Sequence, residues 1–182
     1  MTNEAPKTPR SKLLAILGRV EIEDFAADEV AALGKSEIDF LLEMAKGNAG
    51  GVSPYQRRNA VLLIGLLKPE NAVGAVAGLL KNKDAGLRVY AIRALGRIGT
   101  EDASQALRGV LQSGDATLAE LSYALQALRS TGRQEDLDAV VGFGLKTGIP
   151  LLAERAVGPI PKAPQRDRGP TSIRKRSHGH AR

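Results

Sequence analysis

The sequence contains no cysteine and no tryptophan, and its 182 residues include three phenylalanines and three tyrosines. Without cysteine the chain can form neither a disulfide nor a thiolate metal site, which is typical of proteins from a reducing compartment. With so few aromatic side chains, a core must be built from Ala, Leu, Val and Ile. Because Ala and Leu favour helix over strand, the composition favours an all-α fold.

Long hydrophobic runs are also absent. The longest run, at residues 60–67, is far too short to span a bilayer. The first twelve residues are polar and carry an acid, so they do not have the apolar core of a signal peptide. We therefore expect a soluble, cytoplasmic protein without membrane insertion.

Histidine occurs twice, as His178 and His180, close to the end of the chain. A Ser-His-Asp triad is therefore excluded from the rest of the sequence, and two histidines in a floppy segment do not make a metal site. The glycine-rich residues 45–54 lack the Gly-Lys-Ser/Thr ending of a phosphate-binding loop. We expect no catalytic residues, no metal site and no cofactor.

The net charge of +6 belongs to the C-terminus, because residues 159–182 hold seven basic residues and one acid. This segment is rich in Pro, Gly and Ser and has almost nothing to bury, which predicts a disordered tail. It could bind phosphates with salt-dependent affinity but lacks aromatic side chains for stacking on bases. The candidate anion-binding residues are Arg166, Arg168, Arg174, Lys175 and Arg176.

Capping residues and glycines divide the rest of the chain into short helices. Ser53 followed by Pro54 predicts one helix start, and Asp84 and Gly99 predict the limits of another helix. We expect a disordered N-terminus at 1–10, a helical cap at 11–52, helical hairpins at 53–83, 84–114 and 115–148, and a short capping helix at 151–157.

The hairpins repeat one pattern. Shifting residues 87–111 back by 31 places Ala91 on Ala60, and shifting them forward by 33 places Ala91 on Ala124. Apolar residues then match at helical spacing across whole hairpins. A single hairpin cannot bury its apolar face, but stacked neighbours can, so the repeat predicts a solenoid.

The pattern LRxxAxxALGxIGxxxAxxALxxxL at Leu87–Leu111 closely resembles the HEAT-like repeats of the phycobilisome-lyase type. Residues 56–80 and 120–144 match this pattern more loosely. The resemblance implies a right-handed α-solenoid of about three hairpins, in which the second helix of each hairpin lines a concave face.

The non-core positions of these second helices form a candidate partner-binding stripe. Because Gly78, Gly109 and Gly142 are equivalent in the repeat, the stripe should be shallow. Val141 and Leu145 are apolar, although a solvent-exposed helix face would have polar residues at these positions. We therefore expect either a partner or the segment 149–157 to cover them. The stripe comprises Lys81, Ser104, Gln105, Arg108, Gln112, Asp138, Val141 and Leu145.

Arg57 and Arg88 occupy the characteristic arginine position of the repeat. We interpret them as structural, with charge-assisted hydrogen bonds to neighbouring turns and with Asp84 and Asp115 as acceptors. Arg88, Arg93 and Arg97 share α-helical spacing, but acids lie close in sequence, so we interpret them as a solvated face.

Three functions fit this reading. The first is a non-catalytic scaffold or adaptor that binds a protein partner through the concave helix face. The second is binding of nucleic acid or an anionic surface through the basic tail. The third, implied by the resemblance alone, is an accessory role in a bilin lyase or isomerase activity, although the chain has no cysteine for chromophore attachment.

Overall fold

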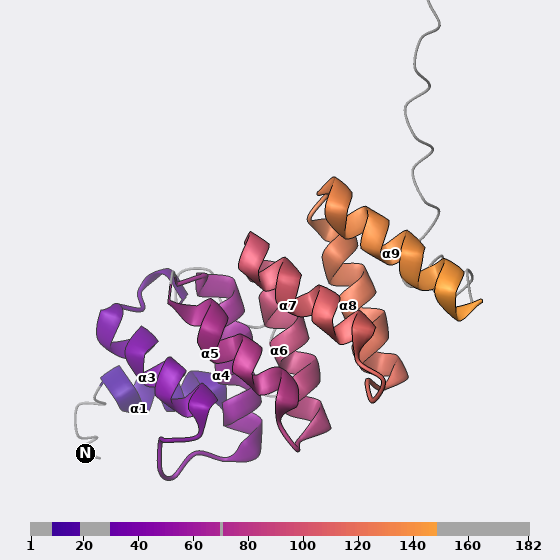
Figure 1. The fold of residues 1–182 in the computed structure, drawn as a ribbon. Helices are drawn as coiled ribbons and strands as arrows, with labels where there is room; N and C mark the ends of the chain where they lie inside the picture. Colours follow the sequence, from indigo (N-terminus) through magenta and orange to yellow (C-terminus); the bar gives the residue numbers. More distant parts are fainter. Residues whose placement is uncertain (1–8, 19–29, 70, 149–182) are drawn as a thin grey trace, which may run out of the picture.

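A computed structural model describes residues 9–18, 30–69 and 71–148, and every regular element in these ranges is helical. The helices stack side by side as an all-α solenoid (Figure 1). None of the described helices is long and apolar enough to cross a membrane. The elements are α1 (Pro9–Leu17), α3 (Lys35–Lys46), α4 (Pro54–Leu67), α5 (Ala72–Gly78), the 3₁₀ helix η2 (Leu79–Lys81), α6 (Ala85–Ile98), α7 (Glu101–Gln112), α8 (Leu118–Ser130) and α9 (Gln134–Thr147).

Local capping sets the ends of the repeat helices, as the sequence predicts. The Ser53 hydroxyl accepts a hydrogen bond from the Gln56 N–H, and Pro54 occupies the first helical position of α4. The Asp84 carboxylate caps α6 by accepting from the Leu87 N–H. Gly99 ends α6 with a φ of 68°, a left-handed conformation that glycine adopts at little cost.

Two boundaries differ from the prediction. α1 begins at Pro9, inside the N-terminus expected to be disordered, because proline is tolerated in the first turn of a helix. Within the hairpin expected at 53–83, α5 spans only Ala72–Gly78, because its sequence AVGAVAG contains two glycines and continues as the 3₁₀ helix η2. Residues 19–29 of the expected cap at 11–52, the capping helix expected at 151–157 and the basic tail lie outside the described residues.

The core is aliphatic, as the scarcity of aromatic residues predicts, and it runs through all the repeats. At the N-terminal end α1 and α3 pack beside α4. Leu13 and Leu17 of α1 are buried, and the Asn59 amide of α4 donates to the Leu17 carbonyl at 2.9 Å. The N-terminal end of the solenoid is therefore closed by the chain itself.

Adjacent repeats approach most closely through their first helices, α4, α6 and α8. A Cβ added at Gly65 of α4 would lie 2.7 Å from the Cα of Ala94 on α6. One repeat later, a Cβ at Gly96 would lie 2.6 Å from the Cβ of Ala127 on α8. Non-bonded carbon atoms do not come this close, so the helices can stack at this distance only with glycine at both positions.

The second helices α5, α7 and α9 contact one another much less extensively. Glycine–alanine contacts thus draw the first helices together, and α4, α6 and α8 form the more closely packed layer of the stack.

Candidate functional site

Arginines tie successive repeats together, with acceptors that differ from those expected. Arg57 donates to the Ala45 carbonyl at 2.8 Å, and Arg88 pairs with Glu120 at 2.6 Å. Asp84 accepts instead from Arg58, and the Asp115 carboxylate accepts from the Ser113 hydroxyl. Arg57 and Arg88 thus form charge-assisted bonds to neighbouring repeats, but Asp84 and Asp115 are not their acceptors.

Glu120 is the buried partner in this set, with a side-chain exposure of 4%. Burial raises the pKa of the Glu120 carboxyl, but hydrogen bonds from the Thr117 N–H and hydroxyl and from Arg88 outweigh burial and hold its pKa below the usual value. Glu120 is therefore ionised at neutral pH, and its charge is balanced by Arg88.

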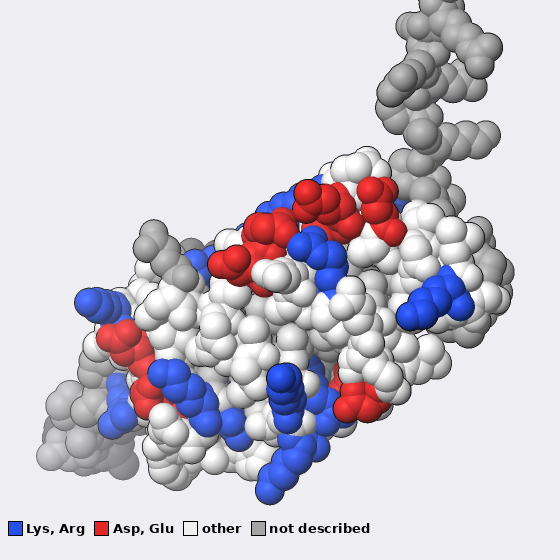
Figure 2. Space-filling view, in the orientation of Figure 1, with Lys and Arg blue, Asp and Glu red and all other residues white. Residues whose placement is uncertain are grey.

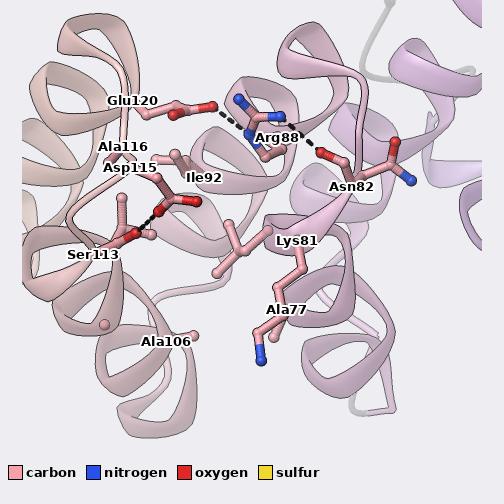
Figure 3. A pocket seen from close by; sticks show the side chains of 13 residues that line it. Ala77, Lys81, Asn82, Arg88, Ile92, Ala106, Ser113, Asp115, Ala116 and Glu120 are labelled. Atoms are coloured by element: carbon pink, nitrogen blue, oxygen red, sulfur yellow. Dashed lines mark hydrogen bonds and ion pairs between the residues drawn. The ribbon is translucent and has the colours of Figure 1, made fainter.

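Arg88 and Glu120 form one wall of a cavity of about 620 Å³ between α5–η2 and α7. In Figure 3 Arg88 lies between Glu120 and Asn82, while Ser113 and Asp115 lie on the other side of the opening from Lys81. The floor is apolar. Its residues are Ala77, Leu80, Ile92, Ala106 and Val110, and the remaining lining residues are Lys81, Asn82, Arg88, Gly109, Ser113, Asp115, Ala116 and Glu120.

We call this cavity the partner groove. It exists because the second helices are widely spaced. Ile92 of α6 contributes to its floor, and closer packing of α5 against α7 would close the cavity. Lys81 and Arg88 are matched by Asp115 and Glu120, so the lining is electrically neutral. An apolar floor with a few polar groups at the rim is the usual character of a binding pocket, and its volume is within the usual range of about 300–1,000 Å³.

Two residues of the predicted stripe bind other residues of the same chain. Ser104 is fully buried and donates to the Asp136 carboxylate at 2.9 Å, so its assignment to a partner-binding surface is wrong. Arg108 forms ion pairs with Glu101 and with Asp136. Both residues are used to join α7 to α9, because Asp136 is a buried carboxylate that needs hydrogen-bond donors.

The other members of the stripe are exposed, but they do not form one surface. Lys81 lines the partner groove, and Gln105 and Gln112 lie on the outer side of α7. On α9, Asp138 accepts from Gln134 at 2.8 Å, whereas Val141 and Leu145 are 41% and 78% exposed. The segment 149–157 that was expected to cover Val141 and Leu145 lies outside the described residues, as do the candidate anion-binding residues of the tail.

Charge is unevenly distributed over the visible face. Figure 2 shows acidic side chains gathered over the first turns of α7 and α9, beside a broad uncharged area. These first turns contain Glu101, Asp102, Glu135 and Asp136, where the helix dipole favours negative charge. Among the described residues no cluster of three His, Cys, Asp or Glu could hold a metal ion.

Sequence reasoning missed the roles of Glu120 and Asp136. Glu120 could have been recognised as part of a capping box, because it follows Thr117 by three residues and its carboxylate accepts from the Thr117 N–H. Its pairing with Arg88 across repeats has no local signal. Asp136 resembles an ordinary acid at a helix start, and its burial depends on contacts with the preceding repeat.

The repeat pattern, the aliphatic core and the glycine–alanine stacking also agree with comparison to known families. No curated protein matches the chain. Residues 38–129 match the family described as HEAT repeats, and this match extends from α3 to the last turn of α8 and covers half of the chain. The protein therefore belongs to the HEAT repeat family.

Proposed function

We propose that the protein is an adaptor that binds a segment of a partner protein in the partner groove between α5–η2 and α7. The observation that supports this proposal is the groove itself: a neutral cavity of about 620 Å³ with an apolar floor, held between consecutive HEAT repeats. A peptide that places one or two apolar side chains against the partly exposed Ala77, Leu80 and Ala106 would remove apolar surface from water on both partners.

The walls of the groove are fixed before any partner binds. Arg88 bonds to Glu120 on one repeat and to the Asn82 carbonyl at 2.8 Å on another, so the wall is held from two sides. A preformed site loses little conformational entropy on binding, which favours recognition of a short segment. The finer assignment to a phycobilisome-type lyase role is not needed for this proposal.

The experiment uses the absence of native cysteine. In the full chain Gly109→Cys introduces a single thiol in the groove, at a position where a Cβ meets no atom within 4 Å. The thiol is labelled with a photoactivatable benzophenone and irradiated in lysate of the source cells, and the captured chain is identified by mass spectrometry. We expect one dominant covalent partner, captured through a peptide with an apolar side chain at the crosslink.

Gly74→Cys and Gly142→Cys are the matched controls, because both glycines are equally open but neither lines the groove. A second arm fills the groove with Ala106→Phe and keeps the label at Gly109. Loss of the partner only in the filled variant supports the proposal. Capture of the same proteins from all three labelled positions, or undiminished capture after filling, would refute it.

A further inference from the structure

A second surface, on the opposite layer of the stack, consists of an arginine between two tyrosine rings. The guanidinium carbon of Arg93 lies 5.9 Å from the ring centre of Tyr90 on α6 and 5.7 Å from that of Tyr123 on α8. Both distances are within the range of cation–π attraction. Tyr90 and Tyr123 are equivalent positions in the repeat, so the stacking of α8 on α6 creates this arrangement.

The helices of this layer carry almost no negative charge. α4, α6 and α8 contain six arginines, at 57, 58, 88, 93, 97 and 129, and a single acid, Glu120. Glu120 is buried against Arg88, and Asp84, which caps α6, accepts two hydrogen bonds from the Arg58 Nη2 at 2.8 and 2.9 Å. The carboxylates nearest to these helices are thus already matched by arginines.

Arg93 makes no ion pair and no hydrogen bond to a carboxylate among the described residues, and it contacts the two tyrosine rings. The two rings lie near its guanidinium group, whose planar set of N–H donors suits bidentate recognition of a carboxylate. The Tyr123 residue is 37% exposed. The surface therefore combines a cation with exposed aromatic area.

We propose that Arg93, Tyr90 and Tyr123 form a docking surface for an acidic amphipathic segment of a partner protein. A Glu or Asp of that segment pairs with the Arg93 guanidinium, and its apolar residues pack on the exposed face of Tyr123. The acidic first turns of α7 and α9 lie on the other layer, so they do not compete for the same carboxylates. The protein thus presents two surfaces of different chemistry, a neutral groove and a cationic aromatic face.

The test uses a synthetic helical peptide of Glu and Leu, with Leu at helical spacing and without aromatic residues, titrated into the full chain. Two of the three tyrosines lie in the proposed surface and the chain has no tryptophan, so intrinsic tyrosine emission reports binding there. We expect saturable binding of the peptide. The substitution Arg93→Gln should weaken this binding at least about tenfold, because it removes a charge-assisted hydrogen bond. The same peptide with Gln in place of Glu should not bind.

Lys146→Gln is the matched control, because it removes one positive charge from an exposed position of α9. The proposal is supported if Lys146→Gln leaves the affinity for the peptide unchanged and if neither Lys146→Gln nor Arg93→Gln changes the Tm. Equal weakening by the two substitutions would overturn it by showing general electrostatic attraction. A further variant neutralises the chain's own acids Glu21, Glu23 and Asp24: if its peptide affinity rises about tenfold or more, the occupant is this internal stretch and not a partner.

Discussion

At the scale of single residues, Asp136 is the polar centre of the last described hairpin. It is fully buried and accepts hydrogen bonds from Ser104 at 2.9 Å, from Thr131 at 2.6 Å and from Arg108. Removing its charge leaves Arg108 without one of its two carboxylates. We expect Asp136→Asn to lower the free energy of unfolding by about 2–3 kcal/mol in denaturant titrations.

The control for this substitution is Asp138→Asn, two residues further along α9. Asp138 is exposed and accepts only from Gln134, so its loss should change stability by about 0.5 kcal/mol or less. Equal effects of the two substitutions would show that the buried network adds nothing beyond an ordinary surface contact.

Asp136 also makes stability depend on pH. Burial raises the pKa of its carboxyl, but hydrogen bonds from Thr131, Ser104 and Arg108 outweigh burial and lower the pKa below the usual 3.8. The stabilisation is therefore complete above the pKa of the unfolded chain and is lost as pH falls through the lower pKa of the folded protein. The stability difference between the wild type and Asp136→Asn should be constant above about pH 5 and shrink below about pH 4. A constant difference down to pH 2 would contradict this.

At the scale of the helix, the stacking contacts predict opposite effects for one type of substitution. Gly96→Ala introduces a methyl group 2.6 Å from the Cβ of Ala127, so overpacking should outweigh the gain in helix propensity and lower stability by about 1–2 kcal/mol. Gly109→Ala introduces the same methyl group into open space on α7 and should raise stability by about 0.5–1 kcal/mol.

The two glycine variants are compared by Tm under identical conditions, with the wild type as reference. Because both exchanges occur within an α-helix, the difference between them isolates the contact between α6 and α8. A rise in Tm for both variants would mean that the helices can move apart at no cost.

The helices were predictable because their signals are local. Ser53, Asp84 and Gly99 cap or end helices through residues within one turn, and the apolar spacing identifies the buried side. The site was less predictable. Ser104 and Arg108 look like surface residues of α7, and only the neighbouring repeat supplies the Asp136 that buries one and pairs with the other. The spacing of the first helices likewise depends on contacts such as Gly65 with Ala94, which link residues far apart in the sequence.

At the scale of the whole molecule, charge is concentrated at one end of the sequence. Residues 159–182 account for the entire net charge of +6, so the remaining chain is neutral. We expect the full chain to bind duplex DNA with an affinity that falls steeply between about 50 and 200 mM salt, and a chain ending at residue 158 to bind far more weakly. Fluorescence anisotropy with labelled DNA measures both. Equal affinity after truncation would locate the binding in the repeats instead.

The register of small residues changes at α8. Arg129 of α8 occupies the place that Gly65 and Gly96 occupy in the two preceding repeats. The arginine side chain stands where the two earlier helices have none. Another helix could therefore come as close to this position of α8 as α8 comes to α6 only if Arg129 were replaced by a small residue.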